Sequence, residues 1–337
     1  MATERRMLSQ QNREELETRG VTVVADVIPH SDCDQYQKLF RKWTKGFGMH
    51  AWPQTKNSLI QRYRSGHLQP AWEVRLAAKP VFAQLWQTDK LLSSLDAIAI
   101  GRPPEQGEET FWSPADNWVH VDQTSDRLGL HAYQGAVYLE ECAEDDWTFE
   151  VLEGSHKYFD EFMDKNQVLR LKPHHLEWFA EKNCPRRRIP CPKGGMVLWD
   201  SRLFHANARP IQGRPNPRRW RYVVFVCMAP ASWATPSDLQ LKRKAYEELK
   251  LTTHWPSQGV AIFSTRINKN EVEDPNLLPE LPEVARSDEA KRLVGILPYP
   301  DDGKDEPDFR PKWDKTKGLD EETFNEAGMR KKPPYKA

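Results

Sequence analysis

The stretch NWVHVDQ, residues 117–123, places a histidine and a carboxylate two positions apart, as His120 and Asp122. Further along the chain, the stretch GGMVLWDSRLFH, residues 194–205, ends on a second histidine, His205. Two imidazoles and one carboxylate from separate segments can bind Fe(II) on one face of an octahedron and leave three positions open for a co-substrate and O2. The pattern therefore predicts an oxygen-activating iron centre with these three residues as its ligands.

A histidine followed two residues later by an acid is weak evidence alone, because the pattern also occurs at His30 and His175. His30 follows a proline at the start of a predicted helix, where Asp32 fits the first turn. His175 falls in a segment with the apolar spacing of an amphipathic helix. Only His120 enters a strand-rich region and has both a later histidine at a strand end and an arginine, Arg221, before the next strand. This context favours the metal interpretation at His120.

The overall composition argues against several classes of protein. The 337 residues carry 49 basic and 49 acidic side chains, and a pI of about 7.2 lacks the basic excess expected of a nucleic-acid-binding protein. The first residues are polar and no apolar run reaches the length of a membrane span, so we expect neither a signal peptide nor a membrane segment. Five cysteines without a Cys-x-x-Cys pair fit reduced thiols. We therefore expect a cytoplasmic protein that acts on a small molecule.

Short apolar runs separated by turns indicate a mainly β fold. We expect a buried strand at residues 21–28 and helices at 9–18, 31–45, 80–95 and 237–250. We expect further strands at 95–100, 135–139, 149–152, 196–199 and 222–228. Strands that follow one another without intervening helices predict an antiparallel sandwich or barrel.

Five ordered motifs between residues 117 and 230 resemble the phytanoyl-CoA dioxygenase-like (PhyH) family of Fe(II)/2-oxoglutarate oxygenases. They are NWVHVDQ, YQGAVYL, VLEGSHKYF, GGMVLWDSRLFH and RWRYVVFVCMAP. The stretches GVTVVADVIP, SGHLQPAWEVR and TTHWP extend the resemblance over most of residues 15–265. It implies a mainly β fold with flanking helices, built on a double-stranded β-helix (jelly-roll, cupin-like) core that presents the metal at its open end. It also implies Fe(II), 2-oxoglutarate as co-substrate and O2, with release of succinate and CO2.

The chain shows no compositional break near its middle, so we expect one oxygenase domain over residues 1–275. Within it we expect helical N-terminal support at about 1–95, the jelly-roll core at about 95–232, and a helix with an extension at 233–275. Residues 276–337 are rich in proline and charge. This composition is typical of a disordered tail or of an extended arm on the surface.

The resemblance also implies an arginine for 2-oxoglutarate. The distal carboxylate of this co-substrate needs a cation, and the planar fork of arginine suits a carboxylate. Arg221 stands where the family's arginine stands, directly before an apolar strand. Its spacing from His205 is longer than the family usually shows, which leaves Arg218 and Arg219 as alternatives.

Three other polar side chains bear on the reaction. A carboxylate at Asp122, rather than Gly or Ala, leaves no vacant position for a halide, so we expect hydroxylation, or hydrogen removal that leads to desaturation or ring closure. Asn207 stands where relatives place a hydroxyl toward the co-substrate, and Gln134 heads a core strand from which it could reach the co-substrate or a metal-bound water. For Asn207 and Gln134, an ordinary hydrogen-bonded strand position is the equal alternative.

Basic residues cluster in sequence on both sides of His205, and they include Arg187 and Arg214. One interpretation is a solvated loop whose charge is balanced by acids elsewhere. The other is a substrate with a carboxylate or phosphate group that Arg187 and Arg214 bind. Two different functions remain as alternatives: a nucleic-acid-modifying oxygenase that uses the strip RPNPRRWR at 214–221, and a catalytically inactive jelly-roll binding protein, which the retained metal positions disfavour.

Overall fold

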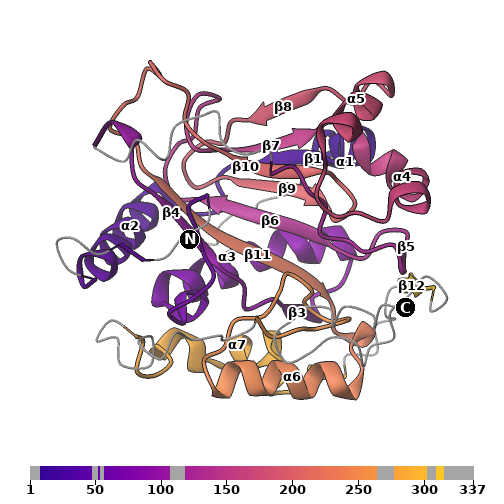
Figure 1. Ribbon diagram of the computed structural model, residues 1–337. Coiled ribbons are helices and arrows are strands. Elements are labelled where there is room, and N and C mark those ends of the chain that lie inside the picture. Colours follow the sequence, from indigo (N-terminus) through magenta and orange to yellow (C-terminus); the bar gives the residue numbers. More distant parts are fainter. Residues whose placement is uncertain are drawn as a thin grey trace, which may run out of the picture.

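The computed structural model describes residues 8–47, 52–53, 57–106, 118–263, 277–301 and 309–314. Two antiparallel sheets form a jelly-roll core with helices around it, which confirms the predicted fold class (Figure 1). The large sheet has the order β1-β9-β6-β11-β4-β2, with β3 paired to β11, and the small sheet has the order β10-β7-β8. The helices are α1 (Gln10–Thr18), α2 (His30–Lys45), α3 (Gln69–Trp86), α4 (Phe159–Asn166), α5 (Pro173–Glu181), α6 (Pro236–Glu247) and α7 (Asp288–Leu293). The strands are β1 (Val21–Val24), β2 (Leu59–Ile60), β3 (Leu91–Ser93), β4 (Ile98–Gly101), β5 (Arg127–Leu128), β6 (Tyr133–Tyr138), β7 (Thr148–Leu152), β8 (Arg186–Ile189), β9 (Met196–Asp200), β10 (His205–Ala208), β11 (Arg221–Pro230) and β12 (Lys312–Trp313).

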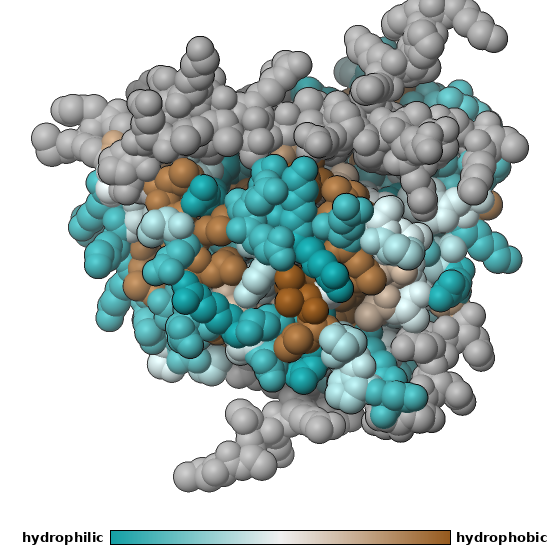
Figure 2. Space-filling view, turned by 90° about the horizontal axis from the view of Figure 1, so that it is seen from below, coloured by the Kyte–Doolittle hydropathy of each residue, from teal (hydrophilic) through white to brown (hydrophobic). Residues whose placement is uncertain are grey.

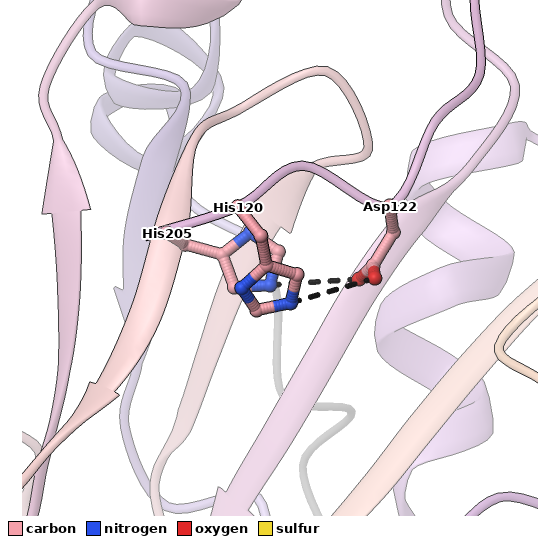
Figure 3. A group of neighbouring side chains, drawn as sticks. All are labelled: His120, Asp122 and His205. Atoms are coloured by element: carbon pink, nitrogen blue, oxygen red, sulfur yellow. Dashed lines mark ion pairs between the residues drawn. The ribbon is translucent and has the colours of Figure 1, made fainter. Parts of the chain in front are cut away.

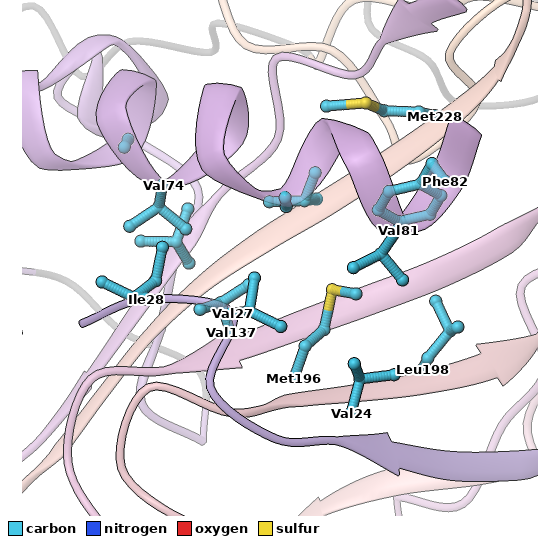
Figure 4. Packing of buried hydrophobic residues seen from close by; sticks show 14 of the residues in the cluster. Val24, Val27, Ile28, Val74, Val81, Phe82, Val137, Met196, Leu198 and Met228 are labelled. Atoms are coloured by element: carbon cyan, nitrogen blue, oxygen red, sulfur yellow. The ribbon is translucent and has the colours of Figure 1, made fainter. Parts of the chain in front are cut away.

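Strand β11 shows how the sequence divides the core into two layers. Its side chains alternate between the two faces of the sheet, as in any strand. The even-numbered residues from Tyr222 to Met228 join the cluster that packs against α3, and Val223 and Phe225 join the cluster between the two sheets. Figure 4 shows the first cluster, in which α3 lies over the large sheet and contributes Val81 and Phe82. The interior of the jelly roll is therefore lined by the odd-numbered face of β11.

Two predicted elements differ from the structure in their bounds. The helix expected at 80–95 is α3, which runs from Gln69 to Trp86 and carries Pro80 inside it. Pro70 lies in its first turn, where the missing N–H is not needed. The strand expected at 21–28 ends at Val24, because Asp26 takes a left-handed φ of 54° and turns the chain. The first difference arises because Pro80 lies inside α3 and does not start it. The second arises because the apolar run in the sequence continues past the end of the strand.

Several short strands were not predicted at all. Strand β8 has the sequence RRRI, which does not alternate, and β10 has the sequence HANA, which alternates but has no β-branched residue and only alanine as its apolar residue. Both gain their hydrogen-bond partners from β7. Tertiary pairing, rather than local sequence pattern, forms the small sheet.

The part of the predicted C-terminal extension that the structure describes lies against the body. In α7, Leu293 belongs to the same apolar cluster as α3. Strand β12 pairs with β5, and Trp313 lies against the guanidinium of Arg127, which contacts Trp255 on its other side. Residues 277–301 therefore contribute to the core and residues 309–314 lie against the body, and the division at residue 275 stays a prediction.

The cysteines and the surface bear on the remaining sequence predictions. All five cysteines are free, as predicted, and all five are buried. Within the ranges given above, no helix is both long and apolar enough to cross a bilayer. Figure 2 views the face that carries α6 and α7, where hydrophobic residues appear in several groups separated by hydrophilic ones.

Candidate metal centre

The small sheet brings the two candidate histidines together. His120 and His205 face each other across an antiparallel bridge, in which each N–H donates to the other carbonyl oxygen, at 2.9 and 2.8 Å. Directly opposed residues of such a pair point to the same face. Both rings therefore project from one face of the sheet, and Figure 3 shows them turned toward the carboxylate of Asp122.

The geometry of these three side chains fits one metal ion. His120 Nε2 lies 3.6 Å from Asp122 Oδ1, and His205 Nε2 lies 3.5 Å from Asp122 Oδ2. Donor atoms that each lie roughly 2.1 Å from one ion are about 3 to 4 Å apart. The Nδ1 atoms are engaged elsewhere, since His120 Nδ1 contacts Trp118 O and His205 Nδ1 contacts Leu203 O, both at 2.9 Å. Each Nδ1–H that donates to a carbonyl leaves the Nε2 lone pair for a metal.

Electrostatics keep two of the three groups in the forms that bind a metal. Burial lowers the pKa of His120 to about 4, and the nearby His205 adds to the shift. Burial alone raises the pKa of Asp122, but His254, His205 and His120 outweigh it and hold that pKa well below its ordinary value. At neutral pH His120 is neutral and Asp122 is ionised. Metal binding therefore needs no proton to leave these two groups.

Two more side chains approach the carboxylate of Asp122. Gln134 Nε2 donates to Asp122 Oδ2 at 3.0 Å, and His254 Nδ1 lies 3.8 Å from the same oxygen. The structure thus places Gln134 beside a candidate ligand. Its Oε1 is buried and accepts no hydrogen bond from the described residues, so a group bound near the metal can donate to it.

Arg221 lies inside the jelly roll with its charge directed at neutral partners. It is 3 % exposed, and its guanidinium donates to Ser58 Oγ at 3.1 Å, Tyr138 Oη at 3.3 Å and Asn207 Oδ1 at 2.7 Å. These partners are all uncharged, and Arg221 Nε has no partner among the described residues. A buried guanidinium without an acidic partner fits a bound carboxylate. Arg221 and Asn207, both expected near 2-oxoglutarate, are brought together.

The two alternative arginines lie elsewhere. Arg219 pairs with Asp146 at 2.8 Å and with Glu141 at 3.2 Å. Arg218 is exposed on the loop before β11. Of the three candidates, Arg221 is the one whose side chain is buried beside Asn207 of the strand that carries His205.

The two arginines expected to bind substrate have different surroundings. Arg214 is 5 % exposed and pairs with Glu105 at 2.8 Å and with Asp146 at 2.9 Å. This placement goes against the prediction that Arg214 binds substrate, because two acids already neutralise its guanidinium. Arg187 is exposed, and it lies opposite Val151, which in turn lies opposite His205. Arg187 therefore projects from the same face of the small sheet as the histidines.

Sequence reasoning missed three residues of this site: Ser58, Tyr138 and His254. Tyr138 was within reach, because it follows Gln134 by four residues on one strand and so shares its face. His254 lies in the motif TTHWP, whose histidine had no assigned role. Ser58 lies in a loop at a left-handed φ of 68°, and no local sequence signal marks it.

A family model described as Phytanoyl-CoA dioxygenase (PhyH) matches residues 16–211 of this chain. The chain belongs to the phytanoyl-CoA dioxygenase family. It is an Fe(II)- and 2-oxoglutarate-dependent dioxygenase, which confirms the predicted enzyme class and cofactors. The described donors fit that metal, since two imidazoles and a carboxylate are the set that such iron enzymes use.

Two relatives of this phytanoyl-CoA dioxygenase family protein indicate its wider similarity. It is 25 % identical over 278 residues to "Ava biosynthesis cluster protein O" of Aspergillus versicolor, which covers 74 % of this chain and 86 % of the relative. Among solved structures it resembles GlcNAc Inducible Gene 2 of Candida albicans, with a TM-score of 0.60 and 15 % identity over 89 % of this chain and 79 % of that one. The second likeness concerns the fold alone.

Proposed function

We propose that this dioxygenase oxidises a small organic substrate that bears a carboxylate or phosphate group. His120, Asp122 and His205 hold the metal in this proposal, and Arg221 with Asn207 holds the co-substrate. Fe(II), 2-oxoglutarate and O2 supply the oxidation: one oxygen atom enters a substrate C–H bond, the other enters succinate, and CO2 leaves. Hydroxylation is the expected outcome, with desaturation or ring closure as further products of the same hydrogen removal.

The protein's own residues orient the co-substrate and cover one side of the site. Arg221 offers a planar pair of N–H groups to the distal carboxylate of 2-oxoglutarate. Phe149 and Trp199 lie against the ring of His205, with centroids at 5.2 and 5.3 Å. This apolar packing excludes water from one side of the metal, which strengthens charge interactions within the site.

One row of residues across the strands of the small sheet supports the proposed class of substrate. Arg187, Val151, His205 and His120 are successive partners across it. Neighbouring strands are about 4.8 Å apart, so the Cα atoms of Arg187 and His205 are separated by roughly 10 Å. An anionic group held by Arg187 would leave the rest of a small molecule at the metal.

The surroundings of Arg187 support this role. Arg186 and Arg188, its neighbours in β8, point to the other face and pair with Glu150. No hydrogen bond or ion pair engages the Arg187 side chain in the described part of the molecule, and its exposure leaves it open to a ligand. The fungal relative is named for a biosynthesis cluster, and this supports a small-molecule substrate.

The test is a screen of small acids, phosphate esters and neutral compounds for stimulated succinate release. We expect carboxylate- or phosphate-bearing compounds to stimulate turnover. Arg187→Ala should raise the KM for such a compound about 10-fold or more, since charge-assisted bonds to a ligand contribute roughly 1.5–3 kcal/mol. Fe(II) affinity should not change.

Arg186→Ala is the matched control, because this arginine is adjacent and basic but lies on the opposite face. It should leave the KM unchanged. Turnover of neutral lipids or terpenes alone, with Arg187→Ala kinetically normal, would return the basic cluster to the solvated-loop interpretation. Salt-dependent nucleic-acid binding with turnover on an oligonucleotide would instead support the base-modifying alternative.

A further inference from the structure

His254 lies at the metal centre but comes from outside the jelly roll. It follows α6, and it lies beyond residues 16–211, the part of the chain that the family model matches. Its Nδ1 is 3.8 Å from Asp122 Oδ2, the oxygen that also accepts the amide of Gln134. Two polar side chains therefore converge on one oxygen of a proposed metal ligand.

The backbone before His254 and the side chain after it are both held in place. Thr252 N–H donates to Leu95 O at 3.0 Å, and Thr253 N–H donates to Ala261 O at 2.8 Å. Trp255 is buried and contacts the imidazole edge-on at 4.8 Å, and the guanidinium of Arg127 covers the indole at 3.7 Å. The contacts of Thr252, Thr253 and Trp255, the neighbours of His254 in the chain, therefore hold its ring in place.

The polar contacts of the ring point to one role. His254 Nε2 is buried and has no hydrogen-bond partner in the residues that the structure describes. The carboxylate of Asp122 is the polar group that the ring approaches. A separation of 3.8 Å is longer than a hydrogen bond, and a movement of less than 1 Å brings Nδ1 to the ordinary donor–acceptor distance of about 3 Å.

We propose that His254 is a positioning residue of the metal centre, which together with Gln134 holds one oxygen of Asp122 so that the other faces the metal. Ligand carboxylates are commonly hydrogen-bonded in this way, and loss of such a partner weakens metal affinity 10- to 100-fold. Because His254 belongs to the segment after α6, that segment completes the metal centre. The inference rests on the proposed ligand set.

The experiment measures Co(II) affinity by anaerobic calorimetry on the full chain, with the melting temperature of the metal-free protein measured alongside. We expect His254→Ala to bind Co(II) roughly 10- to 100-fold more weakly while its metal-free melting temperature stays that of the parent. His254→Gln keeps a donor at this position and should recover most of the affinity. His174→Ala removes an exposed histidine of α5 and should change neither quantity.

Asp122→Ala separates the two levels of the proposal. If Asp122→Ala weakens Co(II) binding and His254→Ala does not, the positioning role is wrong and the ligand set stands. If Asp122→Ala also binds Co(II) normally, the ligand set itself is wrong. In a third outcome, His254→Ala binds Co(II) more weakly and also melts at a lower temperature without metal. If His254→Gln then recovers neither quantity, His254 stabilises the fold and does not position the metal ligand.

Discussion

Replacing Arg221 with alanine should disable 2-oxoglutarate binding without unfolding the protein. The guanidinium is buried and its partners Ser58, Tyr138 and Asn207 are neutral. Its removal therefore leaves no uncompensated charge, only hydroxyl and amide groups that each lose one bond, at about 1 kcal/mol apiece. The loss on the ligand side is larger, since truncating one partner of a buried charge pair costs roughly 2–5 kcal/mol. The apparent 2-oxoglutarate constant should rise by a factor on the order of 30 to 5000.

The assay is an anaerobic titration of the Fe(II)-loaded protein with 2-oxoglutarate and, separately, with 2-oxobutanoate. The second acid keeps the chelating carboxylate and keto group but lacks the distal carboxylate. The parent should strongly prefer 2-oxoglutarate, whereas Arg221→Ala should bind the two acids nearly equally. The affinity for 2-oxobutanoate itself should not change.

Arg218→Ala is the control, because this arginine is exposed on the loop before β11. It should retain the parent's preference. A larger defect in Arg218→Ala than in Arg221→Ala, or an Arg221→Ala variant that still prefers 2-oxoglutarate, would refute the assignment of Arg221 to the distal carboxylate.

Three other predictions concern the ligands, a buried ion pair and pH. Asp122→Ala should abolish succinate formation and leave the metal-free fold intact, and near-normal turnover would rule out the proposed triad. Arg214→Ala should lower the free energy of unfolding in urea by roughly 1.5–3 kcal/mol, because the buried Asp146 keeps Arg219 but loses its hydrogen bond to the charged guanidinium of Arg214; a raised KM at unchanged stability would restore Arg214 as a substrate residue. Burial lowers the pKa of His67 to about 3. Below about pH 6.5 the unfolded chain therefore binds a proton on this histidine that the folded chain does not bind, and the free energy of unfolding falls as the pH falls. Between pH 7 and pH 5 the free energy of unfolding of the parent should fall by roughly 2 kcal/mol more than that of His67→Gln. Equal falls for the two proteins in urea titrations would contradict this prediction.

The metal ligands and most strands of the large sheet could be predicted because their signals are local. Strands β6, β9 and β11 are apolar runs bounded by turns, and the pair His120 and Asp122 lies within three residues. A short run of sequence carries the information for each of them.

The residues that sequence reasoning missed are those placed by long-range contacts. His254 lies beside Asp122 in a segment whose Thr252 N–H donates to Leu95 O, a residue distant in the chain. Acids elsewhere in the chain were one of the two explanations offered for the basic cluster around Arg214, but its partner Asp146 lies far from it in sequence. No periodicity or spacing identifies such a partner, so which acid pairs with Arg214 could not be predicted.

The position of β11 has a consequence for how the chain folds as it is synthesised. This strand pairs with β6, β4 and β3, all of which leave the ribosome earlier. At 5–20 residues per second, the interval between the end of β6 at Tyr138 and the start of β11 at Arg221 lasts on the order of ten seconds. During that time β6 and β4 each expose an unpaired apolar edge, the kind of surface that aggregates or recruits chaperones. When β11 pairs with both strands, it covers those edges and positions Arg221 in the same event, so a nascent chain acquires the proposed co-substrate cation only once the large sheet is complete.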